Sequence, residues 1–478
     1  MAADFLAFDL GAESGRAILG RYNSGLLELK DVSRFANSPV SQPGSLRWDV
    51  LRLWSEIRKT LDRPPVPKLA SIAFDAWGVD YALIGENGQL LENPYHYRDR
   101  RTDGMVEAVG RIIPRARLYS KTGIQFMPIN TLYQIFAASR LTPRLLDAAD
   151  ALITIPDLFN YWLTGNLGAE YTNATTTQFM NAGTRSWATD IFEELGLPSR
   201  LLPQIFEPGT IIGCAGDGTP VVTPASHDTG SAVAAIATEG KAAFLSSGTW
   251  SLLGTEVSAP VMTARALELN FTNEGGVCGT TRLLKNIAGL WLLQSCRRCW
   301  LDEGREYSYD ELLAAAKSET RHFTSLVDPD HGSFLNPVSM VSAIRDFCRN
   351  TGQEAPATPG ACTRTILESL AFKYRLVLES LEELTGHRLE EIRIIGGGSK
   401  NRLLNEFTAN ATGRPVIAGP VEATALGNIA MQMLATGAVS SLAEARAVVE
   451  RSFPTERFES QDTDIWDRHY PRFRQYTG

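Results

Sequence analysis

Short apolar segments separated by glycine-containing turns dominate the first part of the chain. Residues Phe5–Leu10, Arg16–Tyr22 and Leu26–Val32 are each rich in apolar side chains and predict three consecutive antiparallel strands. Asp49 is a favourable N-cap for the next element, a helix in which apolar residues recur at helical spacing. Leu69–Phe74 then predicts a buried strand. The first part of the chain therefore has the element order βββαβ, which is that of a ribonuclease-H-like domain.

The pattern restarts near Thr238–Lys241. Ala242–Ser246 and Trp250–Glu256 predict a strand, a tight turn and a returning strand. A long helix that begins near Thr363 stops at Gly386, and Glu391–Ile395 predicts a strand after it. Because the two halves begin alike, we predict an α/β protein that arose by duplication. Its two related ribonuclease-H-like domains are expected to span residues 1–239 and 240–478.

Composition and charge fit an ordinary globular protein. A chain of 478 residues is too long for one hydrophobic core, and 44% hydrophobic and 21% charged residues are typical values. The net charge of −8 gives no general attraction to nucleic acid or to anionic membranes. No apolar run approaches the roughly 20 residues that cross a bilayer, and the N-terminus lacks the basic region of a signal peptide. We therefore expect a cytoplasmic protein, a monomer or small homo-oligomer without nucleic-acid or membrane partners.

Six cysteines are too few for a disulfide scaffold of this size, and reduced thiols are expected. Cys296 and Cys299 have CxxC spacing, but no second pair completes a zinc site. Both lie in Leu283–Leu301, which we predict to be a helix. They are interpreted as ordinary helix thiols.

Three glycine-containing turns stand where predicted strands end. They are Asp9–Arg16, Ser246–Ser251 and Ile394–Asn401. Small residues in such turns let backbone N–H groups approach a phosphate without obstruction by Cβ. One such turn alone does not indicate a nucleotide site. Three of them, distributed over both halves, predict a nucleotide clamped between two related domains.

Asp9 and Asp228 are the candidate acidic groups for phosphoryl transfer, which needs a Mg²⁺ ligand and a base for the acceptor hydroxyl. Asp9 ends the first predicted strand, where a carboxylate can hold Mg²⁺, although a lone strand-end aspartate is more often simply solvated. Asp228 opens an alanine-rich helical segment and is the candidate base, with His227 as a sugar ligand. An aspartate at a helix start is also a favoured N-cap, so a structural role stays open.

Phe74–Tyr81 combines a glycine, two carboxylates and aromatic rings at a strand end. Aromatic faces suit the C–H groups of a sugar and carboxylates suit its hydroxyls, so this segment is a candidate sugar-binding wall. Trp77 alone would be interpreted as core, and Arg98–Arg101 as a solvated turn.

Taken together, the chain resembles the FGGY family of carbohydrate kinases from about Phe5 to about Gln432. The resemblance rests on these segments: Asp9–Arg16, Trp77–Asp80, Tyr97–Arg101, Ser226–Thr229, Ser247–Trp250, Lys285–Gln294, Gly396–Asn401 and Gly419–Asn428. In combination they are highly specific.

The resemblance implies an actin/hexokinase-like fold whose two domains close on ATP and a ketose across a central cleft. The first domain would bind sugar and phosphate, and the second the nucleotide. The expected ATP contacts fall on Ala12, Glu13, Ser14, Gly15, Arg16, Thr249, Gln294, Gly397 and Gly398. The expected sugar contacts fall on Gly78, His227, Asp228, Thr229 and Asn286, with Asp228 as catalytic base and Asp9 as the candidate metal ligand.

The expected reaction transfers the terminal phosphate of ATP, with Mg²⁺, to L-rhamnulose and gives L-rhamnulose 1-phosphate. L-fuculose, L-xylulose or L-ribulose would use the same machinery, since few contacts decide among sugars. An alternative of another class is an actin-like nucleotide-switch ATPase, which would need neither the sugar wall nor a base at Asp228. Glu13 stands where many relatives carry Ser or Thr, which leaves its role in the phosphate loop open.

Overall fold

The computed structural model describes residues 2–238 and 241–477, and the chain forms two compact units. Unit 1 comprises Met1–Ala237, Glu256–Leu283 and Ala423–Phe453, and unit 2 comprises Thr238–Thr255, Leu284–Glu422 and Pro454–Gly478. The boundary predicted between residues 239 and 240 lies outside the described residues. Unit 1 thus draws on three separate stretches of the chain.

The elements of unit 1 are β1 (Ala3–Leu10), β2 (Ser14–Asn23), β3 (Leu26–Ala36), β4 (Val40–Gln42), β5 (Ser45–Arg47), α1 (Val50–Leu61), β6 (Ser71–Ala76), β7 (Tyr81–Gly85), α2 (Met105–Gly110), α3 (Arg115–Thr122), α4 (Thr131–Leu141), α5 (Pro143–Asp147), β8 (Ala149–Thr154), α6 (Ile155–Thr164), β9 (Ala169–Glu170), α7 (Tyr171–Thr176), β10 (Met180–Asn181), β11 (Ser186–Trp187), α8 (Thr189–Glu194), β12 (Ile205–Phe206), β13 (Thr210–Cys214), β14 (Pro220–Thr223), α9 (Asp228–Ala234), α10 (Ala264–Glu268), β17 (Thr272–Gly275), α16 (Ala423–Ala435) and α17 (Leu442–Ser452).

Unit 2 contains β15 (Ala242–Ser247), α11 (Trp291–Asp302), α12 (Tyr309–Ser318), α13 (Met340–Asn350), α14 (Pro359–Thr385), β19 (Glu391–Ile395), α15 (Arg402–Thr412), β20 (Val416–Ala418), β21 (Glu456–Phe458) and α18 (Thr463–Arg474). Two further strands have residues in both units, β16 (Trp250–Val257) and β18 (Thr281–Ala288).

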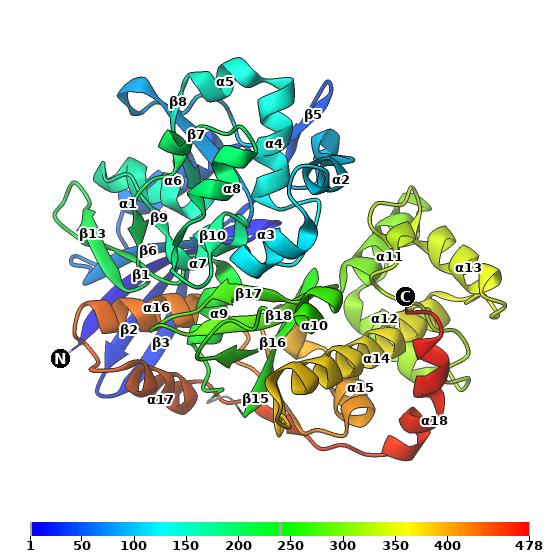
Figure 1. Cartoon of the computed structure of the whole chain (residues 1–478). Coiled ribbons are helices and arrows are strands. Elements are labelled where there is room, and N and C mark those ends of the chain that lie inside the picture. Colours follow the sequence, from blue (N-terminus) through cyan, green and yellow to red (C-terminus); the bar gives the residue numbers. More distant parts are fainter. Residues whose placement is uncertain (1, 239–240, 478) are drawn as a thin grey trace. The chain divides into compact units, whose positions relative to one another are not determined.

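A six-stranded sheet in the order β13-β14-β6-β1-β2-β3 forms the centre of unit 1. The predicted strands are confirmed, and helix α1 begins after Asp49, whose side chain accepts a hydrogen bond from the Arg52 N–H. The strand β1 and its parallel neighbour β6 are almost entirely buried, as expected for strands covered on both faces. Helix α16 packs against β1 and α9 (Figure 1). A Cβ at Gly427 of α16 would lie 1.7 Å from the Ser231 carbonyl oxygen of α9, so only glycine permits this approach.

The strand order of unit 1 recurs in unit 2. In the segment β2-β1-β6-β14-β13 the successive pairs are antiparallel, parallel, parallel and antiparallel. The segment β16-β15-β19-β20-β21 repeats this order and these directions. The predicted duplication is therefore visible in the structure as one strand pattern used twice.

The predicted helix over Leu283–Leu301 is wrong in its first part. The residues up to Ala288 continue strand β18, and helix α11 begins only at Trp291. The apolar residues of Leu283–Leu293 fit a strand or a helix, and the boundary falls at Gly289, directly after the strand. Asn286 accordingly lies on a strand, whereas Cys296 and Cys299 lie on a helix, as predicted.

The aromatic C-terminal segment docks on unit 2. Trp466, Tyr470 and Phe473 of α18 are buried, and the three rings pack around Phe372 of α14. Between residues 2 and 238 and between 241 and 477, no helix is long and apolar enough to cross a membrane.

Candidate active site

The predicted site residues divide between the units. Unit 1 carries Asp9, Ala12 to Arg16, Gly78, His227, Asp228 and Thr229, and unit 2 carries Thr249, Asn286, Gln294, Gly397 and Gly398.

Asn37 fixes the shape of the turn between β1 and β2. Its Nδ2 donates to the Gly11 carbonyl at 2.7 Å, and its N–H donates to the Glu13 carbonyl at 3.0 Å. Glu13 itself is exposed, whereas Gly15 is buried inside β2. A Cβ at Gly15 would lie 2.3 Å from the ring of Phe35, so packing explains this glycine without any ligand.

Asp9 and Asp75 are direct neighbours at the ends of the parallel strands β1 and β6. Arg16 donates to Asp9 Oδ2 through Nε (3.0 Å) and Nη2 (2.7 Å), which leaves Asp9 Oδ1 without a bond to Arg16. Asn428 Nδ2 donates to Asp75 Oδ2 at 2.6 Å, while Asp75 Oδ1 is buried without a hydrogen-bond partner among the described residues. Burial, followed by the Asp9 carboxylate, raises the pKa of Asp75 well above its usual value. An orphaned buried acceptor beside a second carboxylate suits a small cation.

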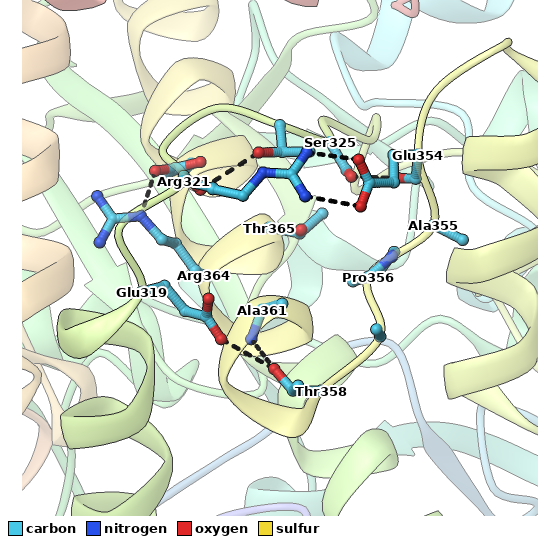
Figure 2. A pocket seen from close by; sticks show the side chains of 13 residues that line it. Glu319, Arg321, Ser325, Glu354, Ala355, Pro356, Thr358, Ala361, Arg364 and Thr365 are labelled. Carbon is cyan, nitrogen blue, oxygen red and sulfur yellow. Dashed lines mark hydrogen bonds and ion pairs between the residues drawn. The ribbon is translucent and has the colours of Figure 1, made fainter.

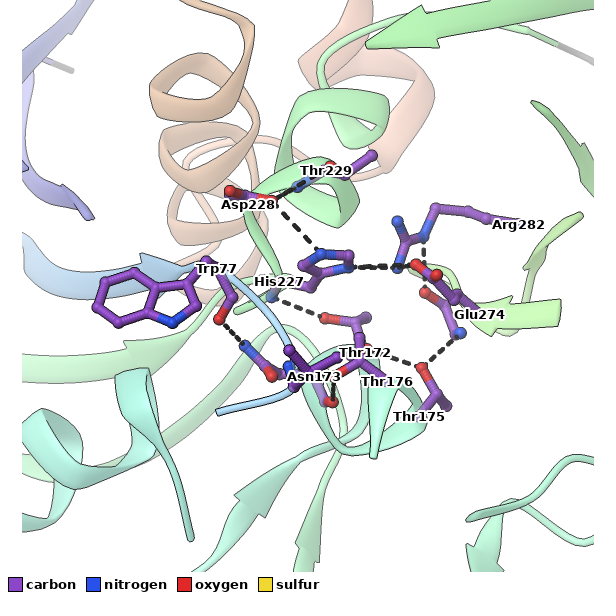
Figure 3. Close-up of polar contacts among 12 residues, drawn as sticks. Trp77, Thr172, Asn173, Thr175, Thr176, His227, Asp228, Thr229, Glu274 and Arg282 are labelled. Atoms are coloured by element: carbon purple, nitrogen blue, oxygen red, sulfur yellow. Dashed lines mark hydrogen bonds and ion pairs between the residues drawn. The ribbon is translucent and has the colours of Figure 1, made fainter. Parts of the chain in front are cut away.

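Asp228 is the first residue of α9, and His227 is its N-cap. The Thr229 N–H (2.5 Å) and the Thr229 hydroxyl (3.2 Å) donate to Oδ1 of the Asp228 carboxylate, and His227 Nε2 lies 3.4 Å from the same oxygen (Figure 3). The side chain keeps 31% of its surface exposed, and in the described part of the chain no donor contacts Oδ2. Burial raises the pKa of Asp228, His227 lowers it, and Asp9 raises it further. The Asp228 carboxylate is thus held through Oδ1, and Oδ2 is free to accept a proton or a hydrogen bond.

Glu170 supports the loop that carries His227 and Asp228. Its carboxylate is fully buried and accepts hydrogen bonds from the Thr172 N–H and hydroxyl, the Asn173 N–H and the Ser226 N–H, at 2.6–3.1 Å. The Thr172 hydroxyl oxygen in turn accepts from the His227 N–H at 3.2 Å. Burial raises the pKa of Glu170 to about 8.

Gly78 precedes a strained residue. Val79 has φ = 67°, in the left-handed region that a β-branched residue rarely adopts. Its N–H donates to Thr176 Oγ1 at 2.9 Å, and its carbonyl accepts from Thr131 Oγ1 at 2.5 Å and Gln134 Nε2 at 3.2 Å. Such conformations persist where the surroundings over-determine them, often at ligand sites. The Gly78 backbone is therefore held in one shape.

Asp80, one of the two carboxylates of the candidate sugar wall, has no capacity left for a sugar. It is fully buried, its Oδ2 accepts from Trp48 Nε1, Trp77 Nε1 and the Tyr97 N–H, and its Oδ1 accepts from Gln134 Nε2. Its role is to fix the aromatic rings around it.

In unit 2 the predicted nucleotide residues lie on connected turns. The Leu290 and Trp291 N–H groups donate to the carbonyls of Gly248 and Thr249, so this turn is bonded to the start of α11, the helix that carries Gln294. Gln294 Oε1 is buried and has no hydrogen-bond partner among the described residues. A Cβ at Gly398 would lie 2.0 Å from Ser247 Oγ, so the triple-glycine turn packs against the end of β15. The structure brings Thr249, Gln294 and Gly398 into one region.

Asn286 lies on β18, the strand whose Ala288 N–H contacts a charge cluster around Lys373. Lys373 Nζ contacts Asp328 Oδ1 at 2.7 Å and Asp330 Oδ2 at 2.9 Å, and Asp330 Oδ1 accepts from the Ala288 N–H. Burial and the nearby Lys373 charge lower the pKa of Lys285 to about 8.

A separate pocket of about 220 Å³ in unit 2, lined in part by charged side chains, contains none of the predicted residues. Its charged side chains already have partners: Arg321 pairs with Glu354, Arg364 with Glu368, and Glu319 accepts from the Thr358 hydroxyl (Figure 2).

Sequence reasoning missed Glu170, Glu274 and Arg282, which support His227 and its loop, and Asn428, which donates to Asp75. Glu170 is the N-cap of α7, but its bond to Ser226, like the contacts of Arg282 with His227 and of Asn428 with Asp75, joins residues that are distant in the sequence. The available signal was a charged residue inside an apolar strand, as at Arg282, which usually means a buried ion pair.

Repeated ribonuclease-H-like units with acidic groups at strand ends and glycine turns are compatible with a carbohydrate kinase. Models of the FGGY family of carbohydrate kinases match the chain with their N-terminal domain over residues 5–232 and their C-terminal domain over residues 243–436. The chain belongs to the FGGY family of carbohydrate kinases, as the resemblance predicted.

Individual relatives refine this result. A rhamnulokinase from Bacteroides thetaiotaomicron is 45% identical and covers 99% of both chains, and one from Pectobacterium atrosepticum is 42% identical over 98% of this chain and 96% of its own. Among solved structures, a gluconate kinase from Lactobacillus acidophilus has a TM-score of 0.81 at 16% identity, covering 99% of this chain and 97% of its own. A Plasmodium falciparum glycerol kinase with ADP has a TM-score of 0.77 at 16% identity, covering 99% and 98%. The predicted actin/hexokinase-like fold is confirmed.

Proposed function

We propose that the protein phosphorylates L-rhamnulose with ATP and produces L-rhamnulose 1-phosphate and ADP. The observation that carries the chemistry is the Asp228 carboxylate, held through Oδ1 with Oδ2 open. The choice of sugar is supported by the rhamnulokinases that are 39–45% identical over nearly the whole chain.

In this reaction Asp228 Oδ2 accepts the proton of the sugar hydroxyl while that oxygen bonds to the terminal phosphorus of ATP. The bond from this phosphorus to the bridging oxygen breaks, and ADP leaves. His227, Thr229, Gly78 and Asn286 contact the sugar. The pKa of Asp228, raised by burial, makes its carboxylate a stronger base than a solvated aspartate.

ATP is assigned to the turn Ala12–Arg16 and to Thr249, Gln294, Gly397 and Gly398. The orphaned Gln294 Oε1 supports this assignment, because a buried acceptor without a donor suits a ligand N–H or O–H group. Mg²⁺ is assigned to Asp9, with the orphaned Asp75 Oδ1 in support. The described residues contain no group of three or more His, Cys, Asp or Glu side chains for a metal, but Mg²⁺ commonly uses one or two carboxylates with water and phosphate oxygens. When bound, it would neutralise charge on the transferred phosphate.

We also place the reaction in the cytoplasm. All six cysteines are free thiols, including Cys296 and Cys362, whose sulfur atoms lie 3.9 Å apart without a disulfide.

A panel of ketoses with coupled detection of ADP tests the proposal. We expect ATP turnover to be negligible without sugar and to be greatest, in kcat/KM, with L-rhamnulose. A higher kcat/KM for L-fuculose, L-xylulose or L-ribulose would reassign the substrate. ATP hydrolysis that no ketose stimulates would instead favour the nucleotide-switch alternative.

A further inference from the structure

The guanidinium of Arg282 is buried directly behind His227. Arg282 is 0% exposed and is among the largest fully buried side chains of the described residues. Its Nε donates to the Gly275 carbonyl at 2.9 Å, and its Nη2 lies 3.2 Å from His227 Nδ1 and 3.3 Å from Glu274 Oε2 (Figure 3). Glu274 supplies the opposite charge, which a buried arginine requires.

An arginine side chain donates hydrogen bonds and cannot accept them, and it stays protonated in proteins. A hydrogen bond from Arg282 Nη2 to His227 Nδ1 therefore requires that Nδ1 carries no proton. The neutral imidazole then has its proton on Nε2. Nε2 faces Asp228 Oδ1 at 3.4 Å, so it is placed to donate to the carboxylate.

This donation has a consequence for the two oxygens of Asp228. Together with the N–H and hydroxyl of Thr229, it brings three donors to Oδ1. Oδ2 is thereby the oxygen left to take a proton from substrate.

We propose that Arg282 is a positioning residue for phosphoryl transfer, which holds His227 in the Nε2–H tautomer so that the imidazole donates to Asp228 Oδ1. The inference rests on the proposed role of Asp228 as base. In the competing arrangement His227 donates from Nδ1 to Glu274 Oε2, which lies 3.2 Å away, and Arg282 serves only as counter-charge to Glu274.

NMR can distinguish these two arrangements without an activity assay, because it reports which ring nitrogen of His227 carries the proton. The chain has six histidines, so the wild-type protein can be labelled with ¹⁵N in histidine and His227 assigned by comparison with His227→Gln. We expect a protonated Nε2 and an unprotonated Nδ1. A protonated Nδ1, in either the neutral ring or the imidazolium, would overturn the proposal. An active Asp228→Asn variant would refute the proposed base and leave this NMR result untouched.

Variants give a second, kinetic test. Arg282→Met with Glu274→Leu removes both charges together, so neither is left buried alone. The matched control is Arg364→Met with Glu368→Leu, an equally buried pair in unit 2 that touches no predicted site residue. Hydrogen-bond partners that orient metal-ligating histidines are worth roughly 10–100-fold in metal affinity or activity, and we take this range as the guide for an orienting arginine. We expect a loss of that size in kcat for the first variant, with an unchanged KM for ATP, and no such loss for the control. Equal kcat values for the two variants would refute the positioning role.

Discussion

Gly397 and Gly398 are adjacent residues of one turn, yet the structure predicts opposite effects for alanine at the two positions. A Cβ at Gly398 would lie 2.0 Å from Ser247 Oγ and 2.7 Å from the Ser247 carbonyl oxygen. A side-chain oxygen can rotate away, but a carbonyl oxygen of strand β15 cannot. A Cβ at Gly397 would have no heavy atom within 4 Å, and φ at this residue is not in the left-handed region.

The magnitude follows from this overlap. Forcing a methyl group into a packed region costs about 1–3 kcal/mol. For a unit of this size, 1 kcal/mol corresponds to roughly 2–4 °C in the melting temperature, so Gly398→Ala should melt roughly 2–12 °C below wild type. Gly397→Ala should melt at the wild-type temperature. On the proposed assignment of this turn to ATP, its methyl group would face the nucleotide, so Gly397→Ala should raise the KM for ATP and leave the KM for the ketose unchanged.

Differential scanning calorimetry and a coupled ADP assay measure both properties on the same preparations. A wild-type melting temperature for Gly398→Ala would refute the packing argument. An unchanged KM for ATP in Gly397→Ala would refute the assignment of this turn to the nucleotide.

Three further predictions concern single side chains. Asp228→Asn should lower kcat by roughly 10²–10⁴-fold in the ADP assay and leave the melting temperature near wild type, since the amide oxygen can replace Oδ1; near-normal turnover would rule out the base. Lys373→Met should lower the free energy of unfolding in urea by about 3–5 kcal/mol, because it leaves Asp328 buried without its cation, whereas Arg349→Met, which removes an exposed pair, should cost less than about 1 kcal/mol. Burial raises the pKa of Glu170 to about 8, so the folded protein favours the protonated form of this side chain. The resulting stabilisation is fully present below the usual pKa of 4.5 and is lost as pH rises through 8. The free energy of unfolding of wild type should therefore fall relative to Glu170→Gln between about pH 5 and pH 9, and parallel curves would contradict this.

The sequence was sufficient to predict the helices and strands whose ends carry strong local signals. Asp49 and Gly386 cap α1 and α14 as predicted, and the strands before the glycine turns are confirmed. The start of α11 was misplaced because Gly289, which separates β18 from the helix, was included in the predicted helix. Discontinuity of unit 1 was not predictable either, because nothing in the composition of Ala423–Phe453 indicates which unit it joins.

For the candidate site, the sequence predicted only those residues that belong to short, recognisable segments. Asp9, His227 and Asp228 belong to such segments, and their contacts now have defined geometry. Thr172, which Glu170 holds, and Arg282 each contact His227 from positions 55 residues away, and these contacts exist only after folding. No local period or spacing encodes contacts of that kind.

The bond between Asn428 and Asp75 has a consequence for the order in which the protein can be built. Its partners are 353 positions apart, and Asn428 is bonded to Gln432, which accepts from Ser71 and donates to the carbonyl of Leu6. A ribosome must therefore translate about nine-tenths of the message before the strands that emerged first receive these partners. Until then a nascent chain carries the Asp75 carboxylate without its amide donor, and a product that stops short of α16 never acquires it.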